Sequence, residues 1–157
     1  MWQPHITVAA VIEYQGSFLL VSDNTSRGVM LNQPAGHLEP NEDLIAAVIR
    51  EVKEESSMDF RPEKIVGMYL YHPNPEQTYL RICFTGSLLD YTKTPCPAQD
   101  DDGVIAANWF DLATIRKRAS EHRSQLVIQC IDDYLNGQLY PLSMLHNIVP
   151  NYMLKVD

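Results

Sequence analysis

Three glutamates at helical spacing are the most chemically distinctive residues of this sequence. Glu51, Glu54 and Glu55 lie at positions i, i+3 and i+4, and because successive helical residues turn by about 100°, they would share one stripe of a helix. Like charges at this spacing repel each other by roughly a few tenths of a kcal/mol per pair. Carboxylate oxygens are also the ligands that hard divalent cations prefer. The stripe therefore predicts a metal site that holds a phosphate-bearing substrate.

The distribution of charge agrees with a bridging cation. The chain of 157 residues has a formal net charge of −8, and residues 36–57 contain six acids and two bases, a balance of −4. This acidity argues against a surface for a nucleic-acid polymer, which needs clustered Lys and Arg. An acidic cleft would repel a small phosphorylated molecule unless cations lay between them. We therefore expect a small-molecule substrate that binds weakly without metal.

The composition fits one globular domain over residues 1–157. A hydrophobic share of 45% and this length allow one sizeable core. The opening residues lack the basic start and apolar run of a signal peptide, and no apolar stretch is long enough for a membrane span. The cysteines Cys83, Cys96 and Cys130 are widely spaced and odd in number, which suits a reducing compartment. We expect a cytoplasmic protein that contacts no membrane and is a monomer, with a homodimer as the alternative.

Strand and helix signals surround the glutamate stripe. Apolar, β-branched runs predict strands over residues 7–13 and 17–22, joined as a hairpin, with a polar loop over 23–28. Asn41 is a candidate N-cap for the helix that carries the stripe. The apolar face of that helix comprises Leu44, Ile45, Val48 and Val52.

The second half of the chain alternates further strands and helices. A second hairpin is predicted from residues 65–71 and 78–88, and a strand from 104–110. Helices are predicted from an Asp111 N-cap through Arg118 and over residues 125–135. Because these elements follow no strict strand-helix-strand rhythm, we expect an α+β fold, a mixed β-sheet with helices packed on it.

The spacing around the stripe resembles the signature of the Nudix hydrolase family. The shared positions are Gly36, Glu42, Arg50, Glu51, Val52, Glu54 and Glu55. The signature then expects a glycine and an apolar residue, where this chain has Ser57 and Met58. A serine held in the left-handed conformation at a helix end should cost about 1 kcal/mol. We expect this departure to lower stability and to leave the chemistry intact.

Residues outside the signature resemble the NudJ-type phosphatase branch of that family. They are residues 4–9 and 32–39, Leu80, Arg81, Trp109 and residues 140–142. This likeness covers nearly the whole chain and implies a Nudix-type α/β/α sandwich. It also implies hydrolysis of nucleoside di- and triphosphates and of thiamine-related pyrophosphates, including hydroxymethylpyrimidine diphosphate.

The resemblance implies a role for each signature residue. Mg²⁺, or Mn²⁺ as the alternative, would be held by Glu51, Glu54, Glu55 and a backbone carbonyl near Gly36. Glu51 or Glu54 would also orient or deprotonate the attacking water, and Arg50 completes the catalytic set. An ion pair between Glu42 and Arg50 would pin the loop to the helix and position the carboxylates.

Other residues are candidates for substrate contact or for a further acid. The aromatic rings of Tyr71 and Tyr79 on the second hairpin could stack on a base, and His37 could meet a terminal phosphate. Arg81 could bind a phosphate or form a structural salt bridge. A further acid is expected from Asp101 or Asp102, for which a polar surface loop is the alternative.

Two other functions compete with this assignment. A Nudix hydrolase of another specificity would cleave ADP-ribose or a nucleotide sugar. A catalytically silent module would keep the cleft only to bind a nucleotide. The alternative without any functional site is that the stripe lies on a solvated helix rich in Glu and Lys.

Overall fold

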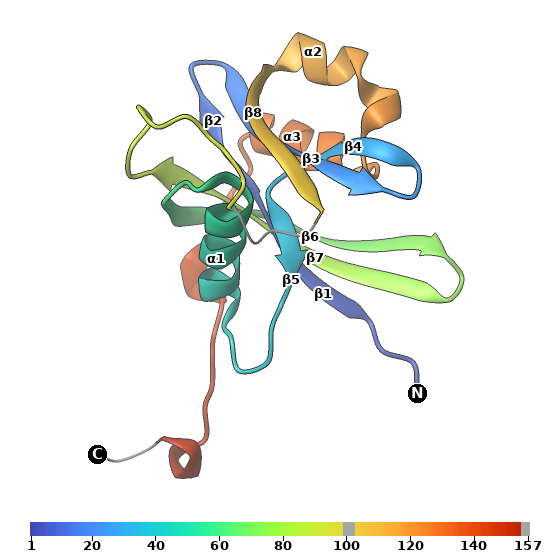
Figure 1. Cartoon of the computed structure of the whole chain (residues 1–157). Coiled ribbons are helices and arrows are strands. Elements are labelled where there is room, and N and C mark those ends of the chain that lie inside the picture. Colours follow the sequence, from blue (N-terminus) through green and yellow to red (C-terminus); the bar gives the residue numbers. More distant parts are fainter. Residues whose placement is uncertain (99–102, 155–157) are drawn as a thin grey trace.

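The computed structural model describes residues 1–98 and 103–154, and its strands form two sheets (Figure 1). The larger sheet has the order β5-β1-β7-β6-β9. It is mixed, because β1 and β7 are parallel while all other neighbouring strands of this sheet are antiparallel. Its strands are β1 (His5–Val11), β5 (Ala35–His37), β6 (Phe60–Asn74), β7 (Gln77–Leu88) and β9 (Tyr140–Pro141).

The smaller sheet is built around β3 (Ser17–Thr25). Strand β8 (Val104–Asp111) pairs along one edge of β3, so the short β2 (Glu13–Tyr14) and β4 (Gly28–Asn32) share its other edge. All of these pairs are antiparallel.

Helices cover both faces of the larger sheet. The α-helices are α1 (Leu44–Ser56), α2 (Leu112–Lys117) and α3 (Leu126–Leu135), and the 3₁₀ turns are η1 (Ala119–Glu121), η2 (Leu142–Met144) and η3 (Asn151–Met153). Along β1, Val8 and Ala10 pack with α1, whereas Ala9 and Val11 pack with α3, as the alternation of strand side chains requires. The predicted α+β class, with a mixed sheet between helices, is confirmed. None of the described helices is long and apolar enough to cross a membrane.

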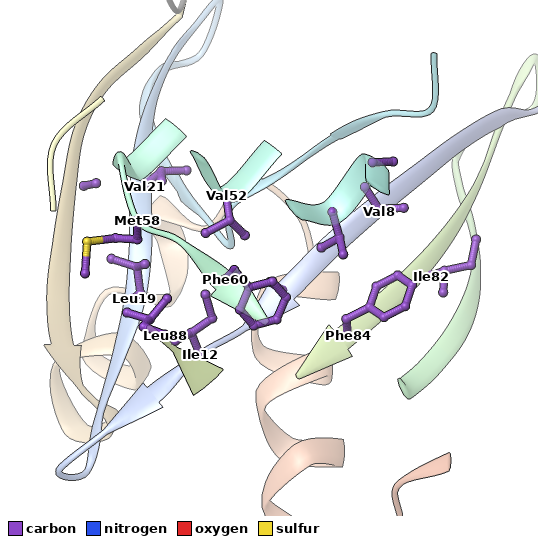
Figure 2. Close-up of a cluster of buried hydrophobic side chains, with 14 of the residues drawn as sticks. Val8, Ile12, Leu19, Val21, Val52, Met58, Phe60, Ile82, Phe84 and Leu88 are labelled. Atoms are coloured by element: carbon purple, nitrogen blue, oxygen red, sulfur yellow. The ribbon is translucent and has the colours of Figure 1, made fainter. Parts of the chain in front are cut away.

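One apolar core joins α1 to both sheets (Figure 2). Val52 of α1 packs in the same cluster as Phe84 of the larger sheet and Leu19 of the smaller one, and all three are buried. Fully burying a side chain of this size contributes roughly 1.5–3 kcal/mol. The core therefore fixes α1 on one face of the larger sheet, with the glutamate stripe beside the edge strand β5.

Of two predictions about the early strands, one is right only in part and the other is wrong. The hairpin of residues 7–13 and 17–22 is present only next to its turn, where Glu13 pairs with Phe18 and the Leu19 N–H donates to the Ile12 carbonyl, because β1 leaves β3 and pairs with β7 in the larger sheet. Residues 23–28 are not a loop, since β3 continues to Thr25 and turns directly into β4. Strands buried on both faces read as continuous apolar runs, so their pattern does not reveal their partner. Residues 23–25 are polar and so do not look like a strand in the sequence, but they form the end of β3 because β4 satisfies their backbone hydrogen bonds.

The later elements agree with the sequence. The second hairpin is present with longer strands, β6 and β7. Asp111 caps α2 by accepting a hydrogen bond from the Thr114 N–H at 2.7 Å. Helix α3 is followed by Gly137 with a positive φ of 76°.

Helix α1 begins later than predicted. Its N-cap is Asp43, whose carboxylate accepts a hydrogen bond from the Ala46 N–H at 2.7 Å. Asn41 is not the cap, because its φ of 63° places it in a left-handed turn before the helix. Both residue types favour caps and tight turns, so the sequence alone did not separate the two roles.

Candidate active site

Helix α1 presents two of its three stripe glutamates to the interior. Glu51 and Glu55 are one turn apart and retain 9% and 5% of their exposure, whereas the Glu54 side chain is 49% exposed. The apolar residues Val48 and Val52 fix this rotation by packing into the core. Two carboxylates therefore lie side by side at the edge of the larger sheet, and the third lies nearer to solvent.

The backbone of β5 runs directly beside these two carboxylates. The Ala35 N–H donates a hydrogen bond to Glu55 Oε1 at 2.6 Å. A Cβ built on Gly36 would overlap the Glu51 carboxylate. Glycine is needed at position 36 for this close approach, which explains its place in the signature more directly than backbone conformation does.

Arg50 joins the loop before α1 to the glutamates. It donates two hydrogen bonds to the Glu42 carboxylate, Nε to Oε1 at 2.7 Å and Nη2 to Oε2 at 3.0 Å. Its Nη2 also donates to the His37 carbonyl at 3.0 Å, and Nη1 lies 2.8 Å from Glu51 Oε1 and 3.3 Å from Glu54 Oε2. The hydrogen bond from Arg50 lowers the pKa of Glu42, and the same bond raises the pKa of Arg50. The ion pair between Glu42 and Arg50 implied by the resemblance is present.

The donor set suits a hard divalent cation in its chemistry. The Glu51 and Glu55 carboxylates and the nearby β5 backbone offer oxygen ligands, which Mg²⁺ and Mn²⁺ prefer, and Gly36 leaves the space that a Cβ would fill. Within residues 1–98 and 103–154, no three His, Cys, Asp or Glu side chains are grouped closely enough to enclose a metal ion. Arg50 contacts both Glu51 and Glu54 in this arrangement. The residues fit a cation if the half-exposed Glu54 moves toward the other two carboxylates.

A cleft of about 700 Å³ opens beside the two buried glutamates. Glu51, Glu55 and Gly36 line one part of it, and the predicted substrate contacts His37, Tyr71, Tyr79 and Arg81 line it too. Arg50 and Glu54 are not among its lining residues. Asp101 and Asp102 lie outside the described residues.

Three rings from neighbouring strands stand together at the cleft. His5 of β1 stacks on Tyr79 of β7 with ring centroids 4.7 Å apart, and His5 Nδ1 lies 3.3 Å from His37 Nε2. Pairing of β5, β1 and β7 in register brings them together. Partial burial, and then the charge of His5, lower the pKa of His37.

Arg81 is a buried cation in the cleft wall. It retains 7% of its exposure, and its Nη1 and Nη2 donate to the side-chain oxygens of Gln33 at 3.2 Å and Asn32 at 3.3 Å. The salt bridge weighed from sequence is absent from the part of the chain that the structure describes. Its Nε has no hydrogen-bond partner there.

The structure adds cleft residues that the sequence did not predict as part of the site. They are Asp23, Arg27, Asn32 and Arg123, contributed by β3, β4, the turn between them and the segment before α3. Arg123 pairs with Asp23 at 2.7 Å across 100 positions of sequence. No local spacing links residues this far apart in the sequence. Because residues 23–28 were predicted as a loop, the β3–β4 hairpin that brings these side chains to the cleft was not predicted either.

The chain is similar to known proteins along most of its length. A family model described as the NUDIX domain matches residues 1–130. A protein named phosphatase NudJ from Shigella boydii is 37% identical over 146 residues, which cover 92% of each chain. The protein of that name from Escherichia coli K12 is 36% identical over the same share of both chains.

A solved structure agrees in fold and in sequence. A NUDIX hydrolase from Nitrosomonas europaea superposes with a TM-score of 0.84 at 41% identity, covering 93% of this chain and 98% of the other. The likeness therefore extends beyond the signature to the whole arrangement of sheets and helices.

Proposed function

The chain belongs to the Nudix hydrolase family, and from this premise we propose that it is a metal-dependent phosphatase of nucleoside di- and triphosphates and thiamine-related pyrophosphates. Hydrolysis of phosphoanhydride bonds follows from family membership itself. The finer specificity, with hydroxymethylpyrimidine diphosphate as one substrate, is supported by the likeness to the phosphatases named NudJ. The structural observation that carries the proposal is the pair of buried carboxylates, Glu51 and Glu55, facing Gly36 in the cleft.

The proposed metal ligands are Glu51, Glu54, Glu55 and a backbone carbonyl near Gly36. A bound Mg²⁺ or Mn²⁺ neutralises phosphate charge and increases the acidity of water. Glu55 is anchored by the Ala35 N–H, which holds one carboxylate oxygen in place and directs the carboxylate toward β5. This anchoring supports Glu55 as the most constant ligand of the set.

The chain's own groups handle the attacking water and its proton. Glu51 or Glu54 orients the attacking water or accepts its proton, and Arg50 contacts both of these carboxylates. Arg50 positions these two side chains, and Glu42 in turn holds Arg50 from two atoms. His37, Tyr71 and Tyr79 contact the organic part or the terminal phosphate of the substrate from the cleft wall.

We also propose that residues 1–157 act as one domain and as a monomer in the cytoplasm. The core shared by α1 and both sheets supports a single folding unit. The odd number and wide spacing of Cys83, Cys96 and Cys130 in the sequence support a reducing compartment.

The test is a substrate panel in which each product is identified by mass. Nucleoside di- and triphosphates, hydroxymethylpyrimidine diphosphate and ADP-ribose are incubated with Mg²⁺ and, separately, with EDTA. We expect release of inorganic phosphate or pyrophosphate from the first two classes with Mg²⁺ only. Faster cleavage of ADP-ribose would overturn the phosphatase specificity, and metal-dependent nucleotide binding without any product would identify a silent binding module.

A further inference from the structure

The positive charge of Arg81 has no carboxylate partner among the described residues. Arg81 retains 7% of its exposure, its guanidinium donates to the neutral amide oxygens of Gln33 and Asn32 at 3.2 and 3.3 Å, and the Cys130 thiol is a further neighbour. Its Nε makes no hydrogen bond in the described structure and is buried from solvent, so the Nη atoms are the ones that a ligand in the cleft can meet. A buried charge is costly unless it is paired. Arg81 lines the cleft, so an anion there would supply the missing partner.

The amino end of α3 lies at the same part of the cleft. Ser124 and Leu126, which precede and begin this ten-residue helix, line the cleft together with Arg81. The first turn of a helix carries a partial positive charge and is a common place for phosphate binding. Gln33 connects the two features, because its side chain accepts from Arg81 and donates to the Val127 carbonyl at 2.7 Å.

Two further arginines lie at this part of the cleft, and one acid accompanies them. Asp23 is paired with Arg123 at 2.7 Å, and Arg27 donates to the Arg123 carbonyl at 2.6 Å. Among the residues that the structure describes, the charged side chains at this part of the cleft are therefore three arginines and one aspartate, and their sum is positive. This is unusual in a chain with a formal net charge of −8.

The cationic region is set apart from the glutamates by the strand order. Thr7 of β1 lies opposite His37 of β5 on one side and opposite Arg81 of β7 on the other. The three side chains therefore share one face of the sheet, and Arg81 is two strand spacings, roughly 10 Å, from the β5 strand that carries Gly36. This face is the one that Ala9 shares with α3, whereas α1 packs on the other, and the cleft connects the two sides past β5. A substrate held at the glutamates can extend through this cleft toward Arg81.

We propose that Arg81 and the amino end of α3 form a second anion-binding site, which holds a phosphate group of the substrate without a metal ion. The proposal deepens the proposed function, because it divides the substrate's phosphates between a metal-assisted end and an arginine end of one cleft. Arg81 contacts the substrate directly, and Asn32 and Gln33 position its guanidinium.

The test measures binding of inorganic phosphate to the full chain in EDTA, by calorimetry or ³¹P NMR. We expect Arg81→Gln to weaken phosphate binding at least tenfold and Arg81→Lys to recover part of the loss. Asn32→Asp is a second test with nearly unchanged shape, since a carboxylate beside Arg81 would compensate its charge and also weaken phosphate binding at least tenfold. Arg61→Gln is the matched control, because that exposed arginine lies outside the cleft.

Glu55→Gln separates this proposal from the proposed function. This variant should lose metal-dependent turnover yet bind phosphate in EDTA within twofold of the wild type. With Mg²⁺ and substrate, inorganic phosphate should raise the KM of the wild type and leave kcat unchanged, as expected if it occupies the place of a substrate phosphate. Wild-type phosphate binding in both Arg81→Gln and Asn32→Asp would overturn the second site, and so would phosphate binding that leaves KM unchanged.

Discussion

At the scale of single residues, the close contact between Gly36 and Glu51 connects the sheet to the proposed chemistry. The β5 backbone can approach the carboxylate only because position 36 has no Cβ. Arg50 and the Ala35 N–H hold Glu51 and Glu55 from the other sides. The carboxylates are thus oriented by the Arg50 guanidinium and the β5 backbone, and precise metal sites are generally supported in this way.

Gly36→Ala tests this contact. Because the new Cβ overlaps the Glu51 carboxylate, either Glu51 or β5 must move, and we expect at least a tenfold loss of Mn²⁺ affinity and a destabilisation of about 1–3 kcal/mol. Gly16→Ala is the control, since Gly16 has a positive φ of 78° but open space around it. It should cost about 1 kcal/mol and leave metal affinity unchanged. Wild-type Mn²⁺ affinity in Gly36→Ala would contradict this role.

Glu42→Gln tests the ion pair through the pH dependence of stability. The hydrogen bond from Arg50 lowers the pKa of Glu42 below its ordinary value of 4.5, so the unfolded chain takes up a proton there more readily than the folded one. The stabilisation is therefore complete above about pH 4.5 and is lost as pH falls through the lowered folded pKa. We expect the difference in unfolding free energy between wild type and variant to be largest near neutral pH and to shrink below pH 4.5. A difference independent of pH would count against the ion pair.

At the scale of elements, α1 positions the glutamates, because the rotation of this helix decides which of its side chains face the cleft. Its rotation was predictable, because the apolar residues at 44, 45, 48 and 52 repeat with helical period and set which side the glutamates occupy. Ser57 takes the left-handed conformation expected at the helix end, with φ 62°, and its hydroxyl donates to the Cys96 carbonyl at 2.7 Å. That hydrogen bond offsets part of the cost of replacing the signature glycine.

Asp43→Ala tests how α1 begins. Removing the hydrogen bond from the Ala46 N–H should destabilise the protein by about 1 kcal/mol. Asp43→Asn, which keeps an acceptor at the cap, should stay within a few tenths of a kcal/mol of the wild type. Chemical denaturation measures both, and equal stability of the alanine variant and the wild type would show that Asp43 is not the cap.

Strand partners were the least predictable part of the fold. Turn residues at Gln15–Gly16 and near Asn74 indicated where the chain reverses direction. The β6–β7 hairpin has its turn after Asn74, and β2 and β3 pair across Gln15–Gly16. The assignment of β1 to one sheet and β3 to another depends on long-range packing that no local pattern encodes. Consequently the signature residues of the cleft were predictable, whereas Arg27, Asn32 and Arg123 were not.

At the scale of the whole molecule, the two sheets and α1 enclose one cleft while the last described residues stand apart. Leu142 and Leu145 pack against the core, but Ile148 and Tyr152 are 82% and 87% exposed. The C-terminal segment extends away from the sheets in Figure 1. Its residues therefore contribute little buried area to the fold.

A chain that ends at Asn147 tests this separation. We expect its unfolding free energy to stay within about 0.5 kcal/mol of the full chain, because the removed described side chains are exposed. A chain that ends at Tyr140 also loses Leu142 and Leu145, and should be destabilised by more than about 1 kcal/mol. Equal destabilisation of the two truncated chains would show that the terminal segment packs on the fold in solution.

The proposed function requires that the glutamates of α1 hold a divalent cation. The most direct measurement is Mn²⁺ binding, followed by electron paramagnetic resonance, together with Mg²⁺-dependent phosphate release in the same preparations. Glu55→Gln keeps an acceptor for the Ala35 N–H and removes one charge, and Glu63→Gln removes a charge from an acid outside the cleft. We predict that Glu55→Gln loses both metal binding and turnover while it remains folded, and that Glu63→Gln matches the wild type. Unchanged Mn²⁺ affinity and turnover in folded Glu55→Gln would contradict this proposal.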